Sequence, residues 1–493
     1  MHNVEGQFDV AKLTTVKNQD HAVLTLGLSF GDVDRDGDLD VALGNWAAGW
    51  YRRIPGNESR NRVVFNDAGQ MNGSNFLALP TPPGETLSIL FSDINGDGNL
   101  DLIEGNDFDI PDAFFIGDGA GGLAPISFAD KIIHHTTTTT MAVKTADLHN
   151  DGVPEIYMAQ IAGRSSGVSK TLKMQKLAAY CDTIKNPQDH ATCTKNMEIK
   201  TWYKSGNNFD PSYASECQKL TGRDQAECKA MLIKDLAIQR RDPEVCKLIP
   251  KSQWSAQAVC NIHFWPARPI TNAEADASIP QILRSNVLLT RGHGSKFTDE
   301  AETNGLDVGG WSWDTKIADF DNDGFQDVYI VNGTWVPNEV SPSNLFFHNQ
   351  GDGTFSEASG PFGLEDYLMT AGATSFDLEG DGDLDIISHP VNGPITVFKN
   401  NAQSGNTIAF DFDDEKGNRF GVGVKVMVKT TDGITQTREL QLGGGFMSFD
   451  APRLHFGLCE NTGIVSGMIT WPDGEITAIG SLAAGARYKI TRR

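Results

Sequence analysis

The sequence lacks any apolar run long enough to span a bilayer, and its first residues have neither the basic start nor the apolar core of a signal peptide. It also lacks a positive net charge. Its formal net charge is −23, which argues against a general nucleic-acid binder. Walker loops, dinucleotide-binding fingerprints and zinc-protease motifs are absent from its 493 residues. The easily recognised membrane, nucleotide-dependent and nucleic-acid-binding classes are therefore excluded.

What recurs instead is an acidic loop of nine residues. Loops 1 to 5 begin at Asp32, Asp93, Asp147, Asp319 and Asp377, so three of the four intervals (61, 54 and 58) are one unit and the fourth, 172, holds an insertion. The typical loop has oxygen ligands at positions 1, 3 and 5, glycine at 6 and a carboxylate at 9, which suits a hard cation such as Ca²⁺. A single copy could equally be an acidic surface turn, but five copies in register argue against that interpretation.

The predicted metal ligands are the oxygen donors of the five loops. They are Asp32, Asp34, Asp36, Asp38 and Asp40; Asp93, Asn95, Asp97, Asn99 and Asp101; Asp147, Asp151, Val153 and Glu155; Asp319, Asp321, Asp323, Phe325 and Asp327; and Asp377, Glu379, Asp381, Asp383 and Asp385. Loop 3 departs from the pattern, with His149 at position 3 and Pro154 at position 8. We therefore expect four to five structural calcium ions.

Each repeat unit has the sequence pattern expected of four short strands. An apolar strand precedes the acidic loop and a second follows it, as at 327–331; a small-residue turn, a third strand and a Gly-rich hairpin complete the unit. Four strands per unit of about 55 to 60 residues are typical of a β-propeller blade.

The insertion, 163–282, breaks this pattern. Apolar residues at helical spacing over 225–239 predict a helix, and the stretch 170–268 carries 16 Lys/Arg against 10 Asp/Glu, which leaves −29 on the rest of the chain. Six of the seven cysteines fall here in three similar segments, and this repeat predicts disulfides 181–193, 217–228 and 246–260. Six cysteines allow 15 pairings, and a zinc cluster is the alternative, although short CxxC spacing is missing.

The place of the insertion predicts a binding face. It lies between the second and third strands of its unit, at the opposite end from the acidic loop, so we expect it to cap the face opposite the metals. Aromatic, Asn, Arg and His residues on that face are candidate ligand-binding residues. They are Trp46, Trp50, Arg52, Asn106, His263, Trp335 and His389. The remaining cysteine, Cys459, is expected to be a buried free thiol.

The last part of the chain carries three recognisable motifs. They are Asn418-Arg-Phe-Gly-Val-Gly423, His455-Phe-Gly-Leu458 and Trp471-Pro-Asp-Gly474. With them the tail resembles the ASPIC/UnbV domain, and the earlier units resemble the FG-GAP or VCBS-type repeats that precede this domain in the cartilage acidic protein family and in many exported bacterial proteins. Similar repeats form the calcium-bearing propeller of integrin α subunits.

This resemblance implies an all-β fold, a seven-bladed β-propeller with integrin-like calcium loops plus a small helical, disulfide-rich insertion. We expect propeller blades with loops 1 to 3 over 1–162, the helical cap over 163–282, blades with loops 4 and 5 over 283–405, and an ASPIC/UnbV-like β region over 406–493 that completes the propeller. Removal of the insertion leaves a length that suits seven blades.

Two functions fit this organisation. The first is an exported, calcium-stabilised module that recognises a glycan or protein partner through the capped face. The second is an extracytoplasmic lyase or hydrolase with its active site between cap and propeller, near His263, Trp265 and Arg268. Catalytic residues and oligomeric state are not predicted. Clustered cysteines and loops suited to millimolar calcium favour a secreted or periplasmic protein whose export signal was removed from this numbering.

Overall fold

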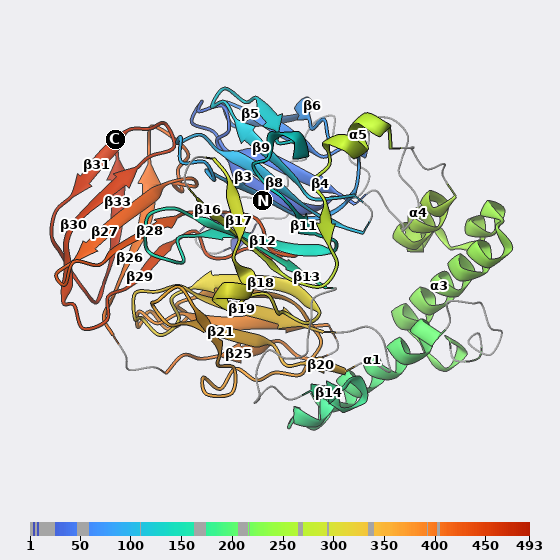
Figure 1. Ribbon diagram of the computed structural model, residues 1–493. Coiled ribbons are helices and arrows are strands. Elements are labelled where there is room, and N and C mark those ends of the chain that lie inside the picture. Colours follow the sequence, from blue (N-terminus) through green and yellow to red (C-terminus); the bar gives the residue numbers. More distant parts are fainter. Residues whose placement is uncertain are drawn as a thin grey trace.

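A computed structural model describes most of the chain. The described residues are 25–46, 59–108, 110–161, 174–205, 217–264, 270–292, 295–333, 340–391, 393–401 and 405–493, with Ser215 and two short N-terminal strands, Asn3–Val4 (β1) and Gln7–Phe8 (β2). The protein is mostly β, with one helical region (Figure 1).

Five antiparallel sheets follow one another along the chain, each in meander order. The first contains Thr25–Gly31 (β3), Asp40–Asn45 (β4), Arg62–Asp67 (β5) and Gln70–Ala78 (β6). The second contains Glu85–Ser92 (β7), Asp101–Asp107 (β8), Ala113–Gly117 (β9) and Leu123–Pro125 (β10). The third contains Thr140–Ala146 (β12), Glu155–Gln160 (β13), Val287–Arg291 (β16) and Phe297–Asp299 (β17). The fourth contains Ser312–Ala318 (β18), Asp327–Asn332 (β19), Leu345–Asn349 (β21) and Phe355–Glu357 (β22), and the fifth Thr370–Phe376 (β23), Asp385–Pro390 (β24) and Thr396–Phe398 (β25).

The five sheets share one local plan. Each acidic loop joins the first and second strands of its sheet, and each first strand has a register shift near its start, as between Thr25 and Gly27 in β3 and between Thr86 and Ser88 in β7. Such a bulge bends the strand and increases its twist. Its recurrence at the same place in five sheets means that the sequence repeat is also a structural repeat.

Neighbouring sheets pack face to face in chain order. The first strands β3, β7, β12, β18 and β23 each contact the next, and each neighbouring pair of sheets shares a hydrophobic core. Between the first two sheets, for example, Val63 packs with Ile89 and Phe115, all fully buried. Burial of such a side chain contributes about 1.5 to 3 kcal/mol, so these cores hold the array together.

The tail forms two sheets of its own. One contains Thr407–Asp414 (β26), Leu454–Gly457 (β29) and Ala486–Arg492 (β33), and the other contains Lys425–Thr430 (β27), Thr435–Glu439 (β28), Gly463–Thr470 (β30), Ile476–Ile479 (β31) and Leu482–Ala483 (β32). They enclose a separate core around Trp471. The expected closed, seven-bladed propeller is not confirmed, because no sheet closes on itself among the described residues and the tail strands pair with one another.

One segment of the tail, 442–450, runs across the first strands of all five sheets. Phe30 of β3 donates its N–H to Leu442, and Gly444 exchanges backbone bonds of 2.9 and 2.8 Å with Ile89 of β7 and Val143 of β12. Further along, Ser448 contacts Asp314 of β18, and Asp450 accepts from Ser375 of β23. The segment therefore ties the sheets together at the centre of the array.

The insertion is helical and leaves the third sheet between β13 and β16, as expected. Its helices are Leu177–Thr183 (η3), Pro187–Ser205 (α1), Gly222–Arg240 (α3), Pro243–Leu248 (η4), Lys251–Gln253 (η5), Trp254–His263 (α4) and Asn272–Ala277 (α5). The three predicted disulfides, 181–193, 217–228 and 246–260, are confirmed. In Figure 1 this module and the tail lie on opposite sides of the sheet array.

Short elements complete the chain. They are Phe128–Asp130 (η2), Thr136–Thr137 (β11) paired with Gln281–Ile282 (β15), Met174–Lys176 (β14) paired with Val340–Pro342 (β20), and Ala301–Asn304 (α6). Cys459 is exposed, so the expectation of a buried thiol was wrong. It occupies a tight turn with φ of 51°, where its backbone bonds Asn322 and Asn406 and its side chain is left outside. Among the described residues, no helix has the length and apolar character needed to cross a membrane.

Candidate functional site

The acidic loops share one conformation, built around the carboxylate at position 1. In loop 2, Asp93 accepts the N–H of Gly96 at 2.7 Å through Oδ1 and the N–H of Gly98 at 2.9 Å through Oδ2. The glycine at position 6 makes the second bond in every loop. Its φ lies between 85° and 98° in all five, a conformation that only glycine adopts at no steric cost. The glycine is therefore required for the turn.

The carboxylate at position 9 is buried and ties the loop to its sheet. In loop 2, Asp101 accepts the N–H of Ile94 through Oδ2 and the N–H of Gly117 on β9 through Oδ1, both at 2.9 Å. Asp40, Asp327 and Asp385 make the equivalent pairs of bonds. Position 9 therefore fixes the third strand as well as the loop, a role that the ligand pattern alone did not reveal.

Burial makes these carboxylates unfavourable as uncompensated charges. Burial raises the pKa of Asp319 to about 8, with a further contribution from Asp323, and burial raises the pKa values of Asp40 and Asp101 to about 7. In loop 1, Oδ1 of Asp32 is buried and has no hydrogen-bond partner among the described residues. A cation at each loop would restore the ionised form and satisfy such oxygens.

Two loops bring their oxygen donors close enough for a metal. The side-chain oxygens of Asp32, Asp34 and Asp36 lie within 4.8 Å of one another in loop 1, and those of Asp319, Asp321 and Asp327 do so in loop 4. Clusters of carboxylate oxygens are the donor set of Ca²⁺. In loop 4 the ring of His348, on β21, also approaches, with Nε2 at 2.9 Å from Asp321. These residues fit a hard divalent cation.

Loop 3 differs, as its sequence indicated. His149 at position 3 places Nδ1 at 3.1 Å from Oε1 of Glu155 at position 9, and this hydrogen bond raises the pKa of His149. Its Nε2 accepts from the side-chain amide of Asn304 at 3.1 Å, which leaves Nδ1 to donate to Glu155. Burial raises the pKa of Asp147 to about 6, and the guanidinium of Arg438 on β28 works against this rise. Loop 3 therefore has a nitrogen donor in place of the oxygen ligand at position 3.

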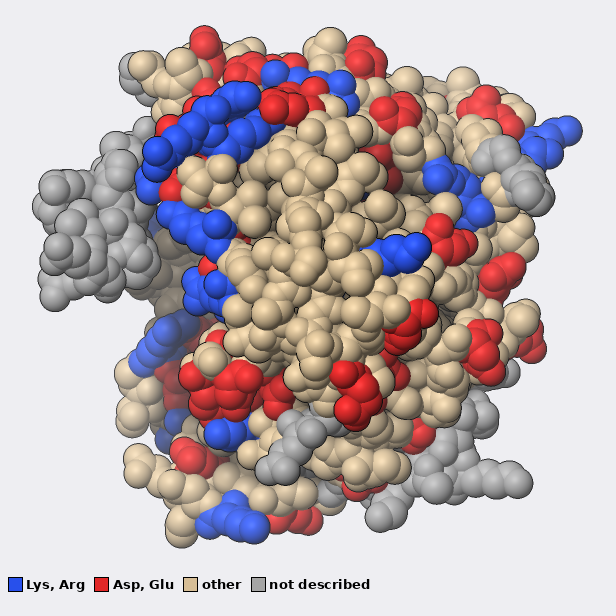
Figure 2. All heavy atoms as spheres, turned by 90° about the vertical axis from the view of Figure 1, so that its left-hand side faces the viewer, with Lys and Arg blue, Asp and Glu red and all other residues tan. Residues whose placement is uncertain are grey.

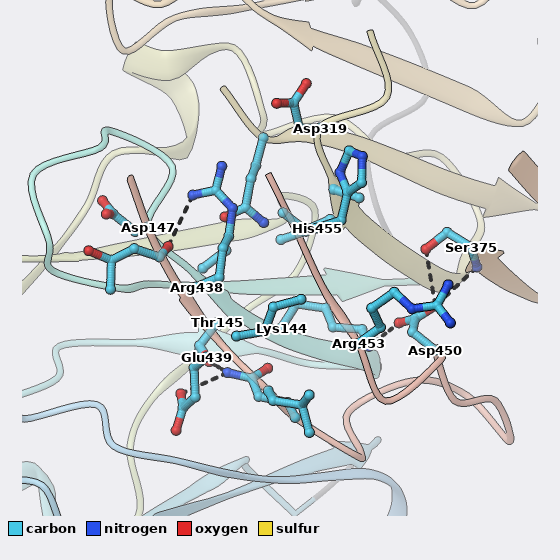
Figure 3. Close-up of a pocket in the computed structure, with 18 of the residues that line it drawn as sticks. Lys144, Thr145, Asp147, Asp319, Ser375, Arg438, Glu439, Asp450, Arg453 and His455 are labelled. Atoms are coloured by element: carbon cyan, nitrogen blue, oxygen red, sulfur yellow. Dashed lines mark hydrogen bonds and ion pairs between the residues drawn. The ribbon is translucent and has the colours of Figure 1, made fainter. Parts of the chain in front are cut away.

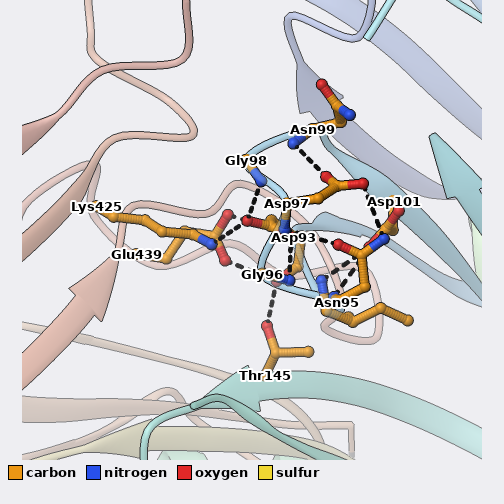
Figure 4. Close-up of polar contacts among 12 residues, drawn as sticks. Asp93, Asn95, Gly96, Asp97, Gly98, Asn99, Asp101, Thr145, Lys425 and Glu439 are labelled. Atoms are coloured by element: carbon orange, nitrogen blue, oxygen red, sulfur yellow. Dashed lines mark hydrogen bonds and ion pairs between the residues drawn. The ribbon is translucent and has the colours of Figure 1, made fainter. Parts of the chain in front are cut away.

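The tail docks onto the face that carries the acidic loops. Figure 4 shows Lys425 of β27 directed at Asp93 of loop 2, with Nζ 2.5 Å from Oδ2. Beside it, Glu439 of β28 accepts from Ser92 at 2.6 Å. At loop 4, Gly457 donates its N–H to Asp319 at 3.1 Å. The tail therefore contacts the loops through charged and backbone groups, rather than extending the sheet array.

A cavity of about 170 Å³ lies between the tail and the loops (Figure 3). The tail contributes Arg438, Glu439, Gln441, Asp450, Arg453 and His455 to it, and the sheets contribute Lys144, Thr145, Asp147, Asp319, Ser375 and Asp377. Three of these carboxylates occupy position 1 of loops 3, 4 and 5. The opposite, outward side of the tail, shown in Figure 2, is largely uncharged at its centre and charged along its edges.

The predicted ligand-binding residues lie on separate elements. Trp50, Arg52 and Trp335 fall outside the described residues, as do Trp265 and Arg268. Trp46 is half-buried beside Glu85, His389 is exposed on β24, and His263 ends α4 with its ring 5.3 Å from Phe264. Asn106 is buried, and its amide already bonds Thr86 and Pro111. Their role in binding stays a prediction.

Sequence reasoning missed the tail side chains that face the loops, namely Lys425, Arg438, Arg453 and His455. One signal was available for His455, which belongs to the His-Phe-Gly-Leu motif. Its ring lies in the cavity, where burial and the two arginines lower its pKa to about 4, so it is neutral. The motif was used to identify the tail and not as a candidate site.

Comparison with known proteins supports the assignment of the tail. The family model described as "ASPIC and UnbV" matches residues 414–493. The chain is similar to cartilage acidic protein 1 of Mus musculus, 30% identical over 168 residues, and of Homo sapiens, 29% identical over 168 residues. Each match covers 33% of this chain and 25% of the relative. The chain thus spans about a quarter of the length of these curated relatives.

Among solved structures, the chain is similar to an Agrocybe aegerita lectin that recognises non-reducing terminal N-acetylglucosamine. The two share 13% identity over 77% of this chain and 81% of that one, with a TM-score of 0.22. A likeness this low carries no argument about fold or ligand.

Proposed function

We propose that this protein is an exported, calcium-stabilised β-propeller that recognises a glycan or protein ligand. The sheets are the blades, stacked in chain order around the segment 442–450. The tail is an ASPIC/UnbV domain and the repeat units are of the FG-GAP or VCBS type, which makes the chain a relative of the cartilage acidic protein family. The three disulfides of the insertion fit an oxidising compartment, in agreement with a secreted or periplasmic location.

The observation that carries the proposal is the set of buried carboxylates that recurs in the repeated loops. Asp319 and Asp327 are both buried in loop 4, and burial, with a further contribution from the charge of Asp319, raises the pKa of Asp327 well above its usual value. A fold that keeps such groups in five equivalent places gains stability from a ligand that binds only the folded state. Calcium is the cation whose ligand set matches, and its role is structural.

Calcium removal tests this part of the proposal. We expect EGTA to lower the melting temperature of the full chain by many degrees, and calcium, but not the same concentration of sodium, to restore it. At a free calcium concentration of 100 times the Kd, each ion contributes about 2.7 kcal/mol. Asp32→Asn and Asp321→Asn should each reduce the calcium-dependent shift, whereas Asp118→Asn, in an exposed turn outside the loops, should leave it unchanged. An EGTA-insensitive melting temperature would contradict the proposal.

Ligand recognition is tested separately. The full chain in millimolar calcium is incubated with polysaccharides and glycoproteins, and mass spectrometry then compares the bound and free fractions. Retention of a chemically unchanged ligand supports a recognition module. New products would instead favour the alternative, an extracytoplasmic lyase or hydrolase, and their loss on deletion of the helical insertion would assign the active site to the cap.

A further inference from the structure

The cavity between the tail and the acidic loops presents an unused hydrogen-bond acceptor. His455 of β29 has its Nε2 2.9 Å from the carbonyl oxygen of Gly382. Because a carbonyl only accepts, Nε2 carries the proton and Nδ1 carries the lone pair. Nδ1 is buried and has no hydrogen-bond partner among the described residues. A buried acceptor without a partner is unfavourable, so this position favours a ligand that donates a hydrogen bond.

Two guanidinium groups lie on either side of this histidine (Figure 3). Arg438 donates to carbonyl oxygens of Gly324 and Thr437 and to the side chains of Asn150 and Gln436, so all of its direct acceptors are neutral. Arg453 uses Nε on Asp411 at 3.0 Å. Within the part of the chain that the structure describes, its terminal nitrogens make no hydrogen bond. The cavity thus has strong donors for an anion, which prefers bidentate arginine contacts.

The remaining charges favour an anion once the loops hold cations. Lys144 contributes a buried ammonium, 3.3 Å from Asp450, and Asp450 is shared with Lys316 at 3.5 Å. The other carboxylates on the cavity wall are Asp147, Asp319, Asp377 and Glu439. Cations bound at loops 4 and 5 would neutralise Asp319 and Asp377. Lys144, Lys425, Arg438 and Arg453 would then face Asp147, Glu439 and Asp450, which leaves one net positive charge on the wall. In this respect the inference rests on the proposed function.

We infer that this cavity binds a small hydroxylated carboxylate, with the carboxylate between Arg453 and Lys144 and a hydroxyl donating to Nδ1 of His455. A volume of about 170 Å³ accommodates one small ring, since a cavity of roughly 150 Å³ holds benzene. A uronic acid combines a ring, hydroxyls and a carboxylate in this way, whether it is a free monosaccharide or the end residue of an acidic polysaccharide. The site lies on the loop face, opposite the capped face.

Calorimetric titration of the full chain tests the inference. The probes are glucuronate, glucose as a neutral molecule of similar size, inorganic phosphate as a small anion, and an oligoglucuronate for the chain-end source, each in millimolar calcium. We expect glucuronate to bind at least tenfold more tightly than glucose, which is about 1.4 kcal/mol. Tighter binding of the oligomer than of the monosaccharide would identify a chain end, and the reverse a free acid. Phosphate binding equal to that of glucuronate would overturn the requirement for a carboxylate.

Two variants and a matched control assign the residues. Arg453→Gln and His455→Gln should each weaken glucuronate binding at least tenfold, and the glutamine at 455 retains a donor for the Gly382 carbonyl. Arg487→Gln is the control, because Arg487 also pairs with Asp411 through Nε but is exposed and does not line the cavity. Its affinity should stay within twofold of the unmodified chain. Equal effects at 453 and 487 would overturn the inference, as would the absence of heat with every probe.

The calcium and ligand proposals fail in different ways. If EGTA leaves the melting temperature unchanged while glucuronate still binds and Arg453→Gln weakens it, the calcium proposal is wrong and the cavity assignment stands. If EGTA lowers the melting temperature but glucuronate binds no better than glucose, the loops hold calcium and the cavity inference is wrong. Should His455→Gln fail to fold, the comparison of positions 453 and 487 still decides the outcome.

Discussion

Gly444 offers the sharpest test of whether the tail holds the sheet array together. It has φ of +76°, its N–H donates to Ile89 at 2.9 Å, and its carbonyl accepts from Val143 at 2.8 Å and Ser88 at 2.7 Å. A Cβ at this position would overlap the carbonyl oxygen of Val143, a backbone atom that has no free path to move. Substitution by alanine must therefore displace the segment 442–450 from the first strands of the second and third sheets.

The cost of Gly444→Ala has two parts. A left-handed conformation costs a non-glycine residue about 1 to 2 kcal/mol, and each buried hydrogen bond left without a partner costs about 1 to 3 kcal/mol more. With two of the three bonds lost, we expect a destabilisation of about 3 to 8 kcal/mol. Gly433→Ala is the control, because Gly433 has φ of +96° in the β27–β28 turn and nothing lies within 4 Å of the added Cβ. Its loss should stay at about 1 to 2 kcal/mol.

Differential scanning calorimetry and limited proteolysis measure the difference. Gly444→Ala should lower the melting temperature at least twice as much as Gly433→Ala, and it should make the boundary near residue 405 more sensitive to protease. If the two variants have the same melting temperature, the contacts of Gly444 with the sheets contribute nothing beyond the cost of its backbone conformation. The segment 442–450 then does not tie the sheets together.

Three further predictions address the charges and the disulfides. Burial and the nearby Glu85 raise the pKa of Asp107 to about 8. Because this folded-state pKa exceeds the unfolded value, the contribution of Asp107 to stability is complete below about pH 4 and is lost as the pH rises to 8. Asp107→Asn should therefore raise the melting temperature at pH 8.5 and not at pH 4, and the same gain at both pH values would contradict this. Lys425→Met removes the cation 2.5 Å from Asp93, so loop 2 should depend more on calcium and the EGTA-induced fall in melting temperature should increase. Lys247→Met, which breaks an exposed ion pair in the insertion, should leave the EGTA-induced fall unchanged. Replacement of Cys246 and Cys260 by serine opens a loop of 14 residues, whose closure contributes about 3 kcal/mol. Protease should then cut the insertion faster, while the melting temperature of the β region is unchanged. A lowered melting temperature of the β region would show that its stability depends on the insertion.

Local chemistry made part of the structure predictable. A glycine at position 6 and carboxylates at positions 1 and 9 determine a loop within nine residues, so the loops and the strands on either side could be placed from sequence. The disulfides were predictable for the same reason, since Cys181 and Cys193 belong to one of three similar segments and their Cα atoms lie 5.8 Å apart. The place of the insertion followed from the repeat, which located the ends of the strands that became β13 and β16.

The docking of the tail was not predictable in this way. Its strands alternate apolar and polar residues with the period of any half-buried strand, so a blade and a separate pair of sheets give the same pattern. The distinction lies in long-range pairing, such as the parallel register of Ile408 with Ala486. Likewise, Gly443-Gly444-Gly445 indicates a turn by composition, although these residues cross the centre of the array in close contact with Ser29 and Val143.

The position of the tail gives a physical reason for its place after the repeats. The first strands of neighbouring sheets lie side by side, and they carry buried polar side chains such as Ser88 and Lys316 that can take further partners. The segment 442–450 supplies them, with the Gly444 carbonyl for Ser88 and with Ser448 for Lys316 at 3.0 Å. On either side of this segment the tail carries Lys425, Arg438 and His455 against the acidic loops. A domain that contacts the first strands and faces the acidic loops at once couples the packing of the sheets to the charge state of the loops. If the loops bind calcium as proposed, its removal should therefore affect the whole array rather than each loop alone.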